Sequence, residues 1–389
     1  MSKNISFDNT EIAFSGMSNA DLNRAYWLFK IININFLVKI GPPITNAAIK
    51  IGLPVTPLIR ATIFKQFCGG ESIQDCAKTI DHLSKYHIGT ILDYSVEGES
   101  KEEVFEATAN EIMLTIKRAK GDAKIPFSVF KVTGVARFGL LEKLDTKAEL
   151  SFEEKKEFER IKDRVRRICQ TAYDADVRIF MDAEESWIQE TIDELSLDMM
   201  RLFNKEKVIV YNTYQYYRHD RLTALKNHDA ALAADGVMMG VKLVRGAYME
   251  KERERALQMG YPSPINPDKQ STDKEYDDAL TYCVENIHRI AICAGTHNEN
   301  SSRHLINLMA EKNIAANDQR IYFSQLLGMS DNLSYNLADA GYNVAKYVPY
   351  GPVKSVLPYL FRRAQENTAI AGQMGRELGL ILKEKARRG

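Results

Sequence analysis

Cysteine is scarce in this 389-residue sequence, which contains only Cys68, Cys76, Cys169, Cys283 and Cys293. The number is odd, the spacings are wide and no CxxC pair occurs, which argues against a disulfide scaffold or a zinc site and fits a reducing compartment. The seven histidines form no HExxH pattern and no other spacing that is typical of metal ligands. We therefore expect no metal centre.

An excess of either charge is also missing, because 52 basic residues balance 52 acidic ones. The bulk charge gives no reason to expect nucleic acid as a partner. We interpret the local basic run at 162–167 as a solvated helix face. A content of 45% hydrophobic and 27% charged residues fits an ordinary globular protein with a large core.

The sequence lacks a long uninterrupted apolar run. Residues 31–59 are fairly apolar, but Lys39, Lys50 and the break at 41–43 interrupt them, and neither side is long enough to span a bilayer. The first thirty residues show neither an Arg-rich presequence nor the apolar core of a signal peptide. We expect a cytoplasmic protein without a transmembrane anchor. Contact of a helical arm with the inner face of a membrane, or with another protein, stays open.

From about residue 86 onward, short β-branched runs alternate with longer amphipathic segments, several with a plausible N-terminal cap at Ser151 or Ser186. Such alternation implies parallel strands joined by helical crossovers. An open doubly wound sheet is the alternative, but no GxGxxG or GxxxxGK[ST] motif is present. Eight strands favour a closed (β/α)₈ barrel, and we predict them at 88–94, 127–132, 177–181, 208–214, 240–244, 290–294, 320–324 and 343–347.

The first 85 residues lie outside the eight strand–helix units. We predict that residues 1–85 form an N-terminal helical arm that ends in a capping helix near 73–86, and that residues 86–389 form the barrel. No internal repeat, low-complexity tract or Pro-rich linker divides the chain further.

Polar residues follow nearly every predicted strand, although strands buried on both faces should be apolar. In a barrel of this kind, catalytic residues lie at the carboxyl ends of the strands. A single polar residue at a strand end is explained equally well by the solvent that begins there. The whole set of polar residues is not. Lys131 could instead be a Schiff-base lysine, as in barrel aldolases. The residues at these strand ends include Lys131, Asp182, Glu184, Gln215, Lys242, Arg245, Tyr248, Thr296, His297, Gln325 and Tyr347.

The segment after the eighth strand carries Tyr359, Arg362, Arg363 and Glu366 at helical spacing, so that they share one helix face. Two adjacent guanidinium groups repel each other unless an anion lies near them. A carboxylate held by both would receive charge-assisted hydrogen bonds worth roughly 1.5–3 kcal/mol each. The competing interpretation is an exposed Arg–Glu salt-bridge face.

Several segments together resemble the signatures of the proline dehydrogenase family, in the same order along the chain. The resemblance covers roughly residues 67–370 and is closest to the stand-alone, mitochondrial-type branch. It implies a distorted (β/α)₈ TIM barrel that binds FAD and oxidises L-proline to 1-pyrroline-5-carboxylate by hydride transfer to flavin N5, the first step of proline catabolism to glutamate. The matching segments are 182–185, 241–248, 295–298, 325–329, 347–351 and 359–367.

The resemblance also implies roles for residues of the substrate site. Arg362 and Arg363 are similar to the pair that grips the proline carboxylate, and Lys131 to the lysine that assists them. Asp182 matches the acidic residue beside this lysine, and Glu71 the carboxylate that pairs with Arg362 to gate the pocket. Walls around the pyrrolidine ring are implied for Tyr248, Leu327, Tyr347 and Tyr359.

For the cofactor, the resemblance implies that Lys242 lies near flavin N5, and Lys242 and Asp182 are the expected catalytic residues. Many bacterial members carry an arginine at the position of Lys242, so a charge is kept here but the planar fork is lost. The implied FAD contacts are Ala183, Gln215, Arg245, Gly246, Ala247, Thr296, His297 and Glu366.

The same resemblance implies a membrane quinone as electron acceptor, and the chain length implies a monofunctional enzyme. The oligomeric state stays open. Two rival functions also stay open at this point: the Schiff-base aldolase that would use Lys131, and a non-catalytic barrel that binds proline as a sensor.

Overall fold

The computed structural model describes residues 5–32, 53–95, 101–369 and 373–389, together with positions 41, 43, 45 and 51. The side chains at 365–369 and 373–374 are not among those described, and much of the apolar segment 31–59 lies outside the described residues. The chain divides into two compact units. One unit comprises Met1–Glu97 and Gln325–Gly389, and the other comprises Gly98–Ser324.

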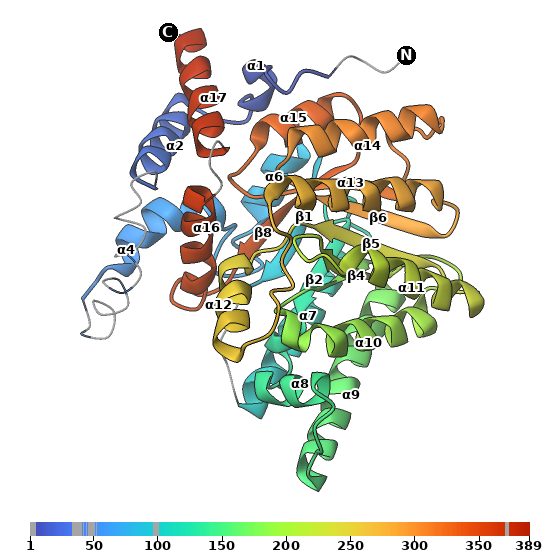
Figure 1. Ribbon diagram of the computed structural model, residues 1–389. Coiled ribbons are helices and arrows are strands. Elements are labelled where there is room, and N and C mark those ends of the chain that lie inside the picture. The colour runs from blue at the N-terminus through green and yellow to red at the C-terminus, as the bar shows by residue number, and fades with distance from the viewer. Residues whose placement is uncertain are drawn as a thin grey trace. The chain divides into compact units, whose positions relative to one another are not determined.

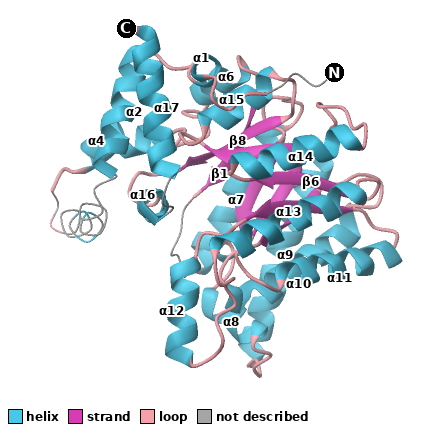
Figure 2. Ribbon diagram, turned by 45° about the horizontal axis from the view of Figure 1, so that its top comes forward, coloured by secondary structure: helices cyan, strands magenta, loops and turns pink. Residues whose placement is uncertain are grey.

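Eight strands form a closed barrel in the order of the sequence. Figure 1 draws strands as arrows, and the pairings of the first strand with the eighth and of successive strands from the second to the seventh are parallel. This confirms the predicted fold class, and every predicted strand end lies within three residues of the observed one. Figure 2 shows the strands surrounded by helices. The strands are β1 (Ile88–Tyr94), β2 (Phe127–Lys131), β3 (Arg178–Asp182), β4 (Val210–Gln215), β5 (Met239–Val244), β6 (Ile290–Gly295), β7 (Ile321–Leu326) and β8 (Val344–Tyr350).

The unit Gly98–Ser324 contains the helices that follow β1 to β6. Ser151 caps α9 through a reciprocal capping box with Glu154, as the sequence predicts. The predicted cap at Ser186 is wrong, because Ser186 is the first residue of α10 and its hydroxyl donates to Glu252 at 2.6 Å. The helices are α7 (Glu102–Ala119), the 3₁₀ turn η2 (Val132–Gly134), α8 (Phe138–Asp145), α9 (Phe152–Ala175), α10 (Ser186–Phe203), α11 (Arg221–Ala234), α12 (Met249–Met259), α13 (Lys269–Glu285) and α14 (Glu299–Glu311).

Aromatic side chains fill the barrel near the amino ends of its strands. Phe127 stacks on Phe180 with ring centroids 4.5 Å apart, and Tyr322 meets Phe127 edge to face at 4.8 Å. The guanidinium of Arg178 lies over the rings of Phe127 and Tyr322, at 5.4 and 5.2 Å. This end is therefore a packed core, which leaves the polar chemistry to the carboxyl ends of the strands.

The unit Met1–Glu97 with Gln325–Gly389 contains β1, β8 and the helices at both ends of the chain. Here α6, which lies within the predicted capping helix at 73–86, packs on β1. The helix α17 packs on α1 and α2. The helices are α1 (Thr10–Ala13), α2 (Asn19–Ile32), α4 (Thr56–Ile59), the π-helical turn η1 (Arg60–Phe64), α5 (Lys65–Phe67), α6 (Ala77–Ser84), α15 (Asp331–Asp339), α16 (Leu357–Ala369) and α17 (Gln373–Arg388).

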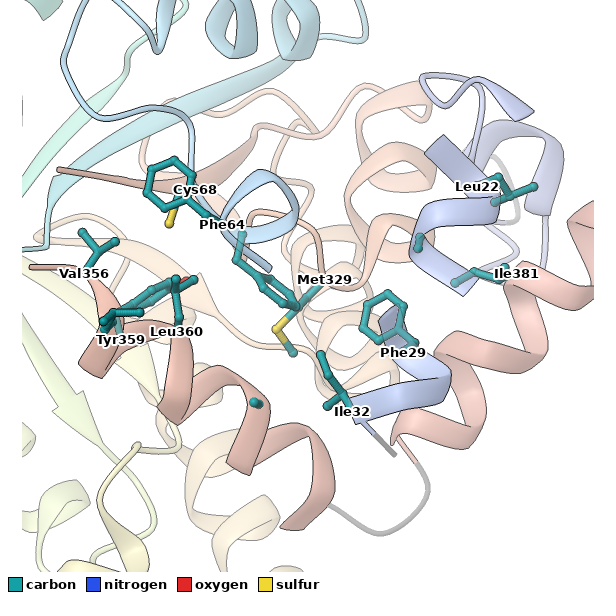
Figure 3. Packing of buried hydrophobic residues seen from close by; sticks show 14 of the residues in the cluster. Leu22, Phe29, Ile32, Phe64, Cys68, Met329, Val356, Tyr359, Leu360 and Ile381 are labelled. Atoms are coloured by element: carbon teal, nitrogen blue, oxygen red, sulfur yellow. The ribbon is translucent and has the colours of Figure 1, made fainter. Parts of the chain in front are cut away.

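The helical arm shares a hydrophobic core with the C-terminal helices (Figure 3). Phe29 and Ile32 of α2 belong to this core together with Ile381 of α17 and Leu360 of α16. Burial of such side chains contributes roughly 1.5–3 kcal/mol each. The arm is therefore an integral part of its unit, a role that the sequence pattern did not reveal.

Among the described residues, no helix is both long enough and apolar enough to cross a membrane.

Replacement of a core residue of the arm tests its contribution to stability. Phe29 is 2% exposed and meets Phe67 edge to face, so we expect Phe29→Ala to lower the free energy of unfolding by about 3–5 kcal/mol. Ile31, on the same helix, is 49% exposed, and Ile31→Ala should change it by about 0.5 kcal/mol or less. Urea unfolding measures both, and equal shifts of the two midpoints would contradict the assignment.

Candidate active site

Four neighbouring strands of the barrel bring a lysine–aspartate pair together at their carboxyl ends. The register of β2 and β3 places Lys131 beside Asp182. The carboxylate of Asp182 forms an ion pair with the ammonium group of Lys242 on β5, and the hydroxyl of Thr213 on β4 donates to it at 3.4 Å. The Lys242 side chain is only 6% exposed. Asp182 is thus the partner of Lys242 that the sequence left undetermined.

Glu184 is a buried carboxyl group to which sequence reasoning gave no role. It accepts hydrogen bonds from the backbone N–H of Thr133, at 3.0 Å, and from the Thr133 hydroxyl. Burial raises the pKa of Glu184 to about 7, although the nearby Lys131 and the bonds from Thr133 oppose the shift. Because Thr133 is two residues beyond Lys131, Glu184 fixes the backbone that carries this lysine. Its place in the motif 182–185 was visible in the sequence, but its burial was not.

Arg245, which follows β5, is held in one orientation by three polar contacts. Its Nε lies 2.7 Å from Asp273, and its two terminal nitrogens donate to the hydroxyls of Thr296 at 2.7 Å and Ser301 at 2.8 Å. The guanidinium carbon Cζ also lies 4.4 Å from the ring centroid of Tyr276. A guanidinium has five N–H donors, and these contacts use three of them. Arg245 and Thr296, both expected as cofactor contacts, lie together, whereas Asp273 and Ser301 were not among the residues predicted from the sequence.

Gly246 lies where the chain passes an aromatic ring. Its φ is +119°, and a Cβ built at this position would lie 2.6 Å from the Tyr217 ring. The backbone N–H of Tyr217 donates to the carbonyl of Arg245 at 2.7 Å. Any side chain here would force the ring or the backbone to move. Ala247 and Tyr248 follow and are half-buried.

The other residues implied for the cofactor lie at the ends of β3, β4 and β6. Gln215 is buried, and its amide nitrogen donates to the carbonyl of Glu184 at 2.6 Å. Ala183 is buried, and the backbone N–H of Thr296 donates to Ser324 at 3.1 Å. His297 is half-buried. This unit therefore presents cationic, amide and hydroxyl donors around a glycine-lined turn, a donor set that fits a cofactor with phosphate and polar ring groups.

The two arginines implied for the substrate carboxylate lie in the other unit, on α16. Arg363 is 7% exposed, and its guanidinium lies 5.2 Å from the ring centroid of Tyr359, which is itself buried. Arg362 is half-buried. An exposed salt-bridge face is thus the wrong interpretation for Arg363. Glu366 lies in α16, but its side chain is outside the described part of the structure.

Two of the implied walls belong to the same unit and contact each other. The backbone N–H of Leu327 donates to the carbonyl of Tyr347 at 2.8 Å. Tyr347 is buried, and Leu327, in the turn after β7, is half-buried.

The carboxylate of Glu71 forms an ion pair with Arg60 of η1 and accepts a hydrogen bond from the N–H of Val353 at 3.3 Å. Its pairing with Arg362 stays a prediction.

Within the described residues, no group of three histidine, cysteine or acidic side chains is arranged to hold a metal ion. The five cysteines are free thiols and are buried.

The statistical profile of one protein family, described as Proline dehydrogenase, matches residues 76–376. The chain belongs to the proline dehydrogenase family. The matched region contains every strand of the barrel and both arginines of α16. This membership makes the protein an oxidoreductase of proline metabolism, and the family implies a flavin as cofactor.

Individual relatives agree with this family. Proline dehydrogenase 1, mitochondrial, of Dictyostelium discoideum is 32% identical over 426 residues, which cover 98% of this chain and 74% of the relative. The human protein of the same name is 39% identical over 270 residues, which cover 69% of this chain but only 45% of that protein. The chain thus spans less than half of the human relative.

Among solved structures, proline utilization A from Bdellovibrio bacteriovorus, inactivated by N-propargylglycine, aligns with a TM-score of 0.72. The alignment covers 95% of this chain and 37% of that chain, at 21% identity. At this identity the likeness supports the barrel fold.

The pair formed by Asp182 and Lys242 makes a prediction about stability. We expect Asp182→Ala to lower the free energy of unfolding by about 3–5 kcal/mol, because it leaves a buried ammonium group without its partner. The double variant Asp182→Ala/Lys242→Met should recover much of this loss. In the exposed pair of Arg201 and Asp235, Asp235→Ala should cost less than about 1 kcal/mol. Chemical denaturation measures these values, and additive losses in the double variant would count against the pairing.

Glu184 makes a prediction about pH. Its pKa is about 7 in the folded protein against 4.5 for an unperturbed glutamate side chain, so its contribution to stability falls as the pH rises from about 4.5 through about 7. Glu184→Gln removes this titration. The stability of the variant relative to the parent should therefore rise across this window by on the order of 3 kcal/mol and stay level outside it. Unfolding curves at several pH values measure the difference, and a difference independent of pH would refute the shift.

Proposed function

We propose that this protein uses FAD to oxidise L-proline to 1-pyrroline-5-carboxylate, with hydride transfer to flavin N5, as the first step of proline catabolism to glutamate. The observation that carries the proposal is the buried Arg363 beside Arg362 on α16, in a chain of this family. A buried guanidinium next to a second one favours an anionic ligand, and proline offers a carboxylate.

Substrate binding must solve an electrostatic problem, because free proline is a zwitterion. Arg362, Arg363 and Lys131 would neutralise its carboxylate. The same positive surroundings favour loss of the proton from the ring nitrogen, which gives the neutral amine that hydride loss at C5 requires. Tyr347, Tyr359, Leu327 and Tyr248 would enclose the ring, and Glu71 would gate the pocket.

The cofactor would be held by the donors at the ends of β3 to β6. Arg245, Gln215, Thr296 and the turn at Gly246 provide charged, amide, hydroxyl and backbone groups, with Ala183, Ala247, His297 and Glu366 as further contacts. The bound flavin supplies the hydride acceptor. Lys242 offers a cation whose position is fixed by Asp182, and such preorganised charge stabilises charge that develops during the reaction. We propose a membrane quinone as the final electron acceptor.

The decisive experiment is anaerobic titration of the purified protein with proline, followed by its visible spectrum. We expect a yellow protein whose flavin absorbance is bleached by proline. In Arg363→Met, bleaching should need roughly 10- to 100-fold more proline, because a charge-assisted contact to the carboxylate is lost. Arg376→Met serves as the control and should titrate like the parent. Arg376 is a half-exposed arginine of α17 that forms an ion pair with Asp8 near the N-terminus.

Other outcomes of this experiment would favour the rival functions. A colourless protein that takes up no FAD, and whose Lys131 is trapped by borohydride with a carbonyl substrate, would indicate the aldolase. A protein that binds proline but holds no flavin would indicate the sensor.

A further inference from the structure

The turn that carries Leu327 is bound to strand β8 by a buried lysine. Lys346 of β8 is 1% exposed, and its ammonium group donates to the carbonyls of Met329 at 2.8 Å and Leu326 at 3.3 Å. It also forms an ion pair with Asp331 at 2.7 Å. A fully buried ammonium group requires such partners. The backbone on both sides of Leu327 is therefore fixed to β8.

A second contact fixes the middle of this turn. The amide nitrogen of Gln66, a buried residue of α5, donates to the carbonyl of Gly328 at 3.1 Å. Gly328 has a φ of +74°, and a Cβ at this position would lie 2.2 Å from the carbonyl oxygen of Gln66. The close approach of the two backbones leaves Leu327 little freedom.

A third contact comes from the C-terminal helix. Glu377 of α17 is 6% exposed, and its carboxylate accepts a hydrogen bond from the backbone N–H of Ser330 at 2.6 Å. Ser330 precedes α15, has a φ of +49° and does not cap this helix with its own side chain. The carboxyl group of Glu377 therefore accepts from the backbone N–H of the N-cap residue, the bond that a glutamate at N3 makes in a capping box, and holds a residue in a strained conformation.

We propose that Glu377 is a positioning residue for the substrate site: from α17 it fixes the turn 326–330 and thereby the place of Leu327 against the substrate ring. Lys346 and Gln66 fix the same turn from β8 and α5. This inference takes one point from the proposed function, namely that Leu327 contacts the bound proline. Figure 3 shows Met329, which lies between Leu327 and Ser330, within the core formed by the helical arm and the C-terminal helices.

The test compares three variants of the full-length protein loaded with FAD. Glu377→Ala removes the acceptor, whereas Glu377→Gln keeps a carbonyl oxygen that can accept from Ser330. Glu384→Ala is the matched control, because Glu384 is a buried carboxylate on the same helix that pairs with Arg387 and Arg388. Hydrogen exchange of the Ser330 amide, the KM and kcat for proline, and the flavin content are measured for each.

We expect Glu377→Ala to speed exchange at Ser330 and to raise the proline KM roughly tenfold, while kcat changes less. Glu377→Gln should stay within about threefold of the parent KM, and Glu384→Ala should lower the melting temperature without changing the KM. Unchanged exchange at Ser330 in Glu377→Ala, or an unchanged KM despite faster exchange, would overturn the inference. An equal rise of KM in Glu384→Ala would also overturn it, since loosening of α17 alone would then be sufficient.

The exchange measurement separates this inference from the proposed function, because it does not depend on turnover. Faster exchange at Ser330 in a protein that never oxidises proline would support the contact with Glu377 and refute the proposed function.

Discussion

The ion pair between Asp182 and Lys242 is the constraint on which the polar end of the barrel depends. Both side chains belong to strands whose central positions are buried, so each charge needs the other as its partner. The pair joins β3 to β5 and, through the register with Lys131, sets the place of a second lysine on β2. Several charged side chains can therefore lie at this end of the strands without destabilising the barrel.

The same principle extends to the backbone around the pair. Glu184 holds Thr133 beyond β2, and Gln215 of β4 donates to the carbonyl of Glu184. Arg245 is oriented by Asp273, Thr296 and Ser301. Buried polar groups with satisfied partners resist rearrangement, and a site that does not reorganise during the reaction is what positioning of substrate and cofactor requires.

The sequence alone predicted the barrel and its strands well, because alternating strands and helices leave a clear period in the apolar residues. It also placed the polar residues at the correct ends of the strands. It could not identify their partners: Lys242 and Asp182 are 60 residues apart, and Ser330 and Glu377 are 47 apart. The cap at Ser186 was wrong for the same reason, since Glu252, 66 residues away, engages its hydroxyl. Local patterns specify elements, whereas charged partners are chosen by the fold.

The C-terminal helix shows which contacts of the turn 326–330 a sequence pattern leaves out. Glu377 and Glu384 belong to the same amphipathic helix and look equivalent as charged residues, yet both are buried and serve different neighbours. Glu384 pairs with Arg388, which donates to the carbonyl of Phe14 in the arm, while Glu377 binds the turn behind Leu327. A buried carboxylate destabilises the fold unless donors surround it, and each of these two glutamates has its own donors. One helix thus joins the arm and the turn 326–330 into a single packed unit.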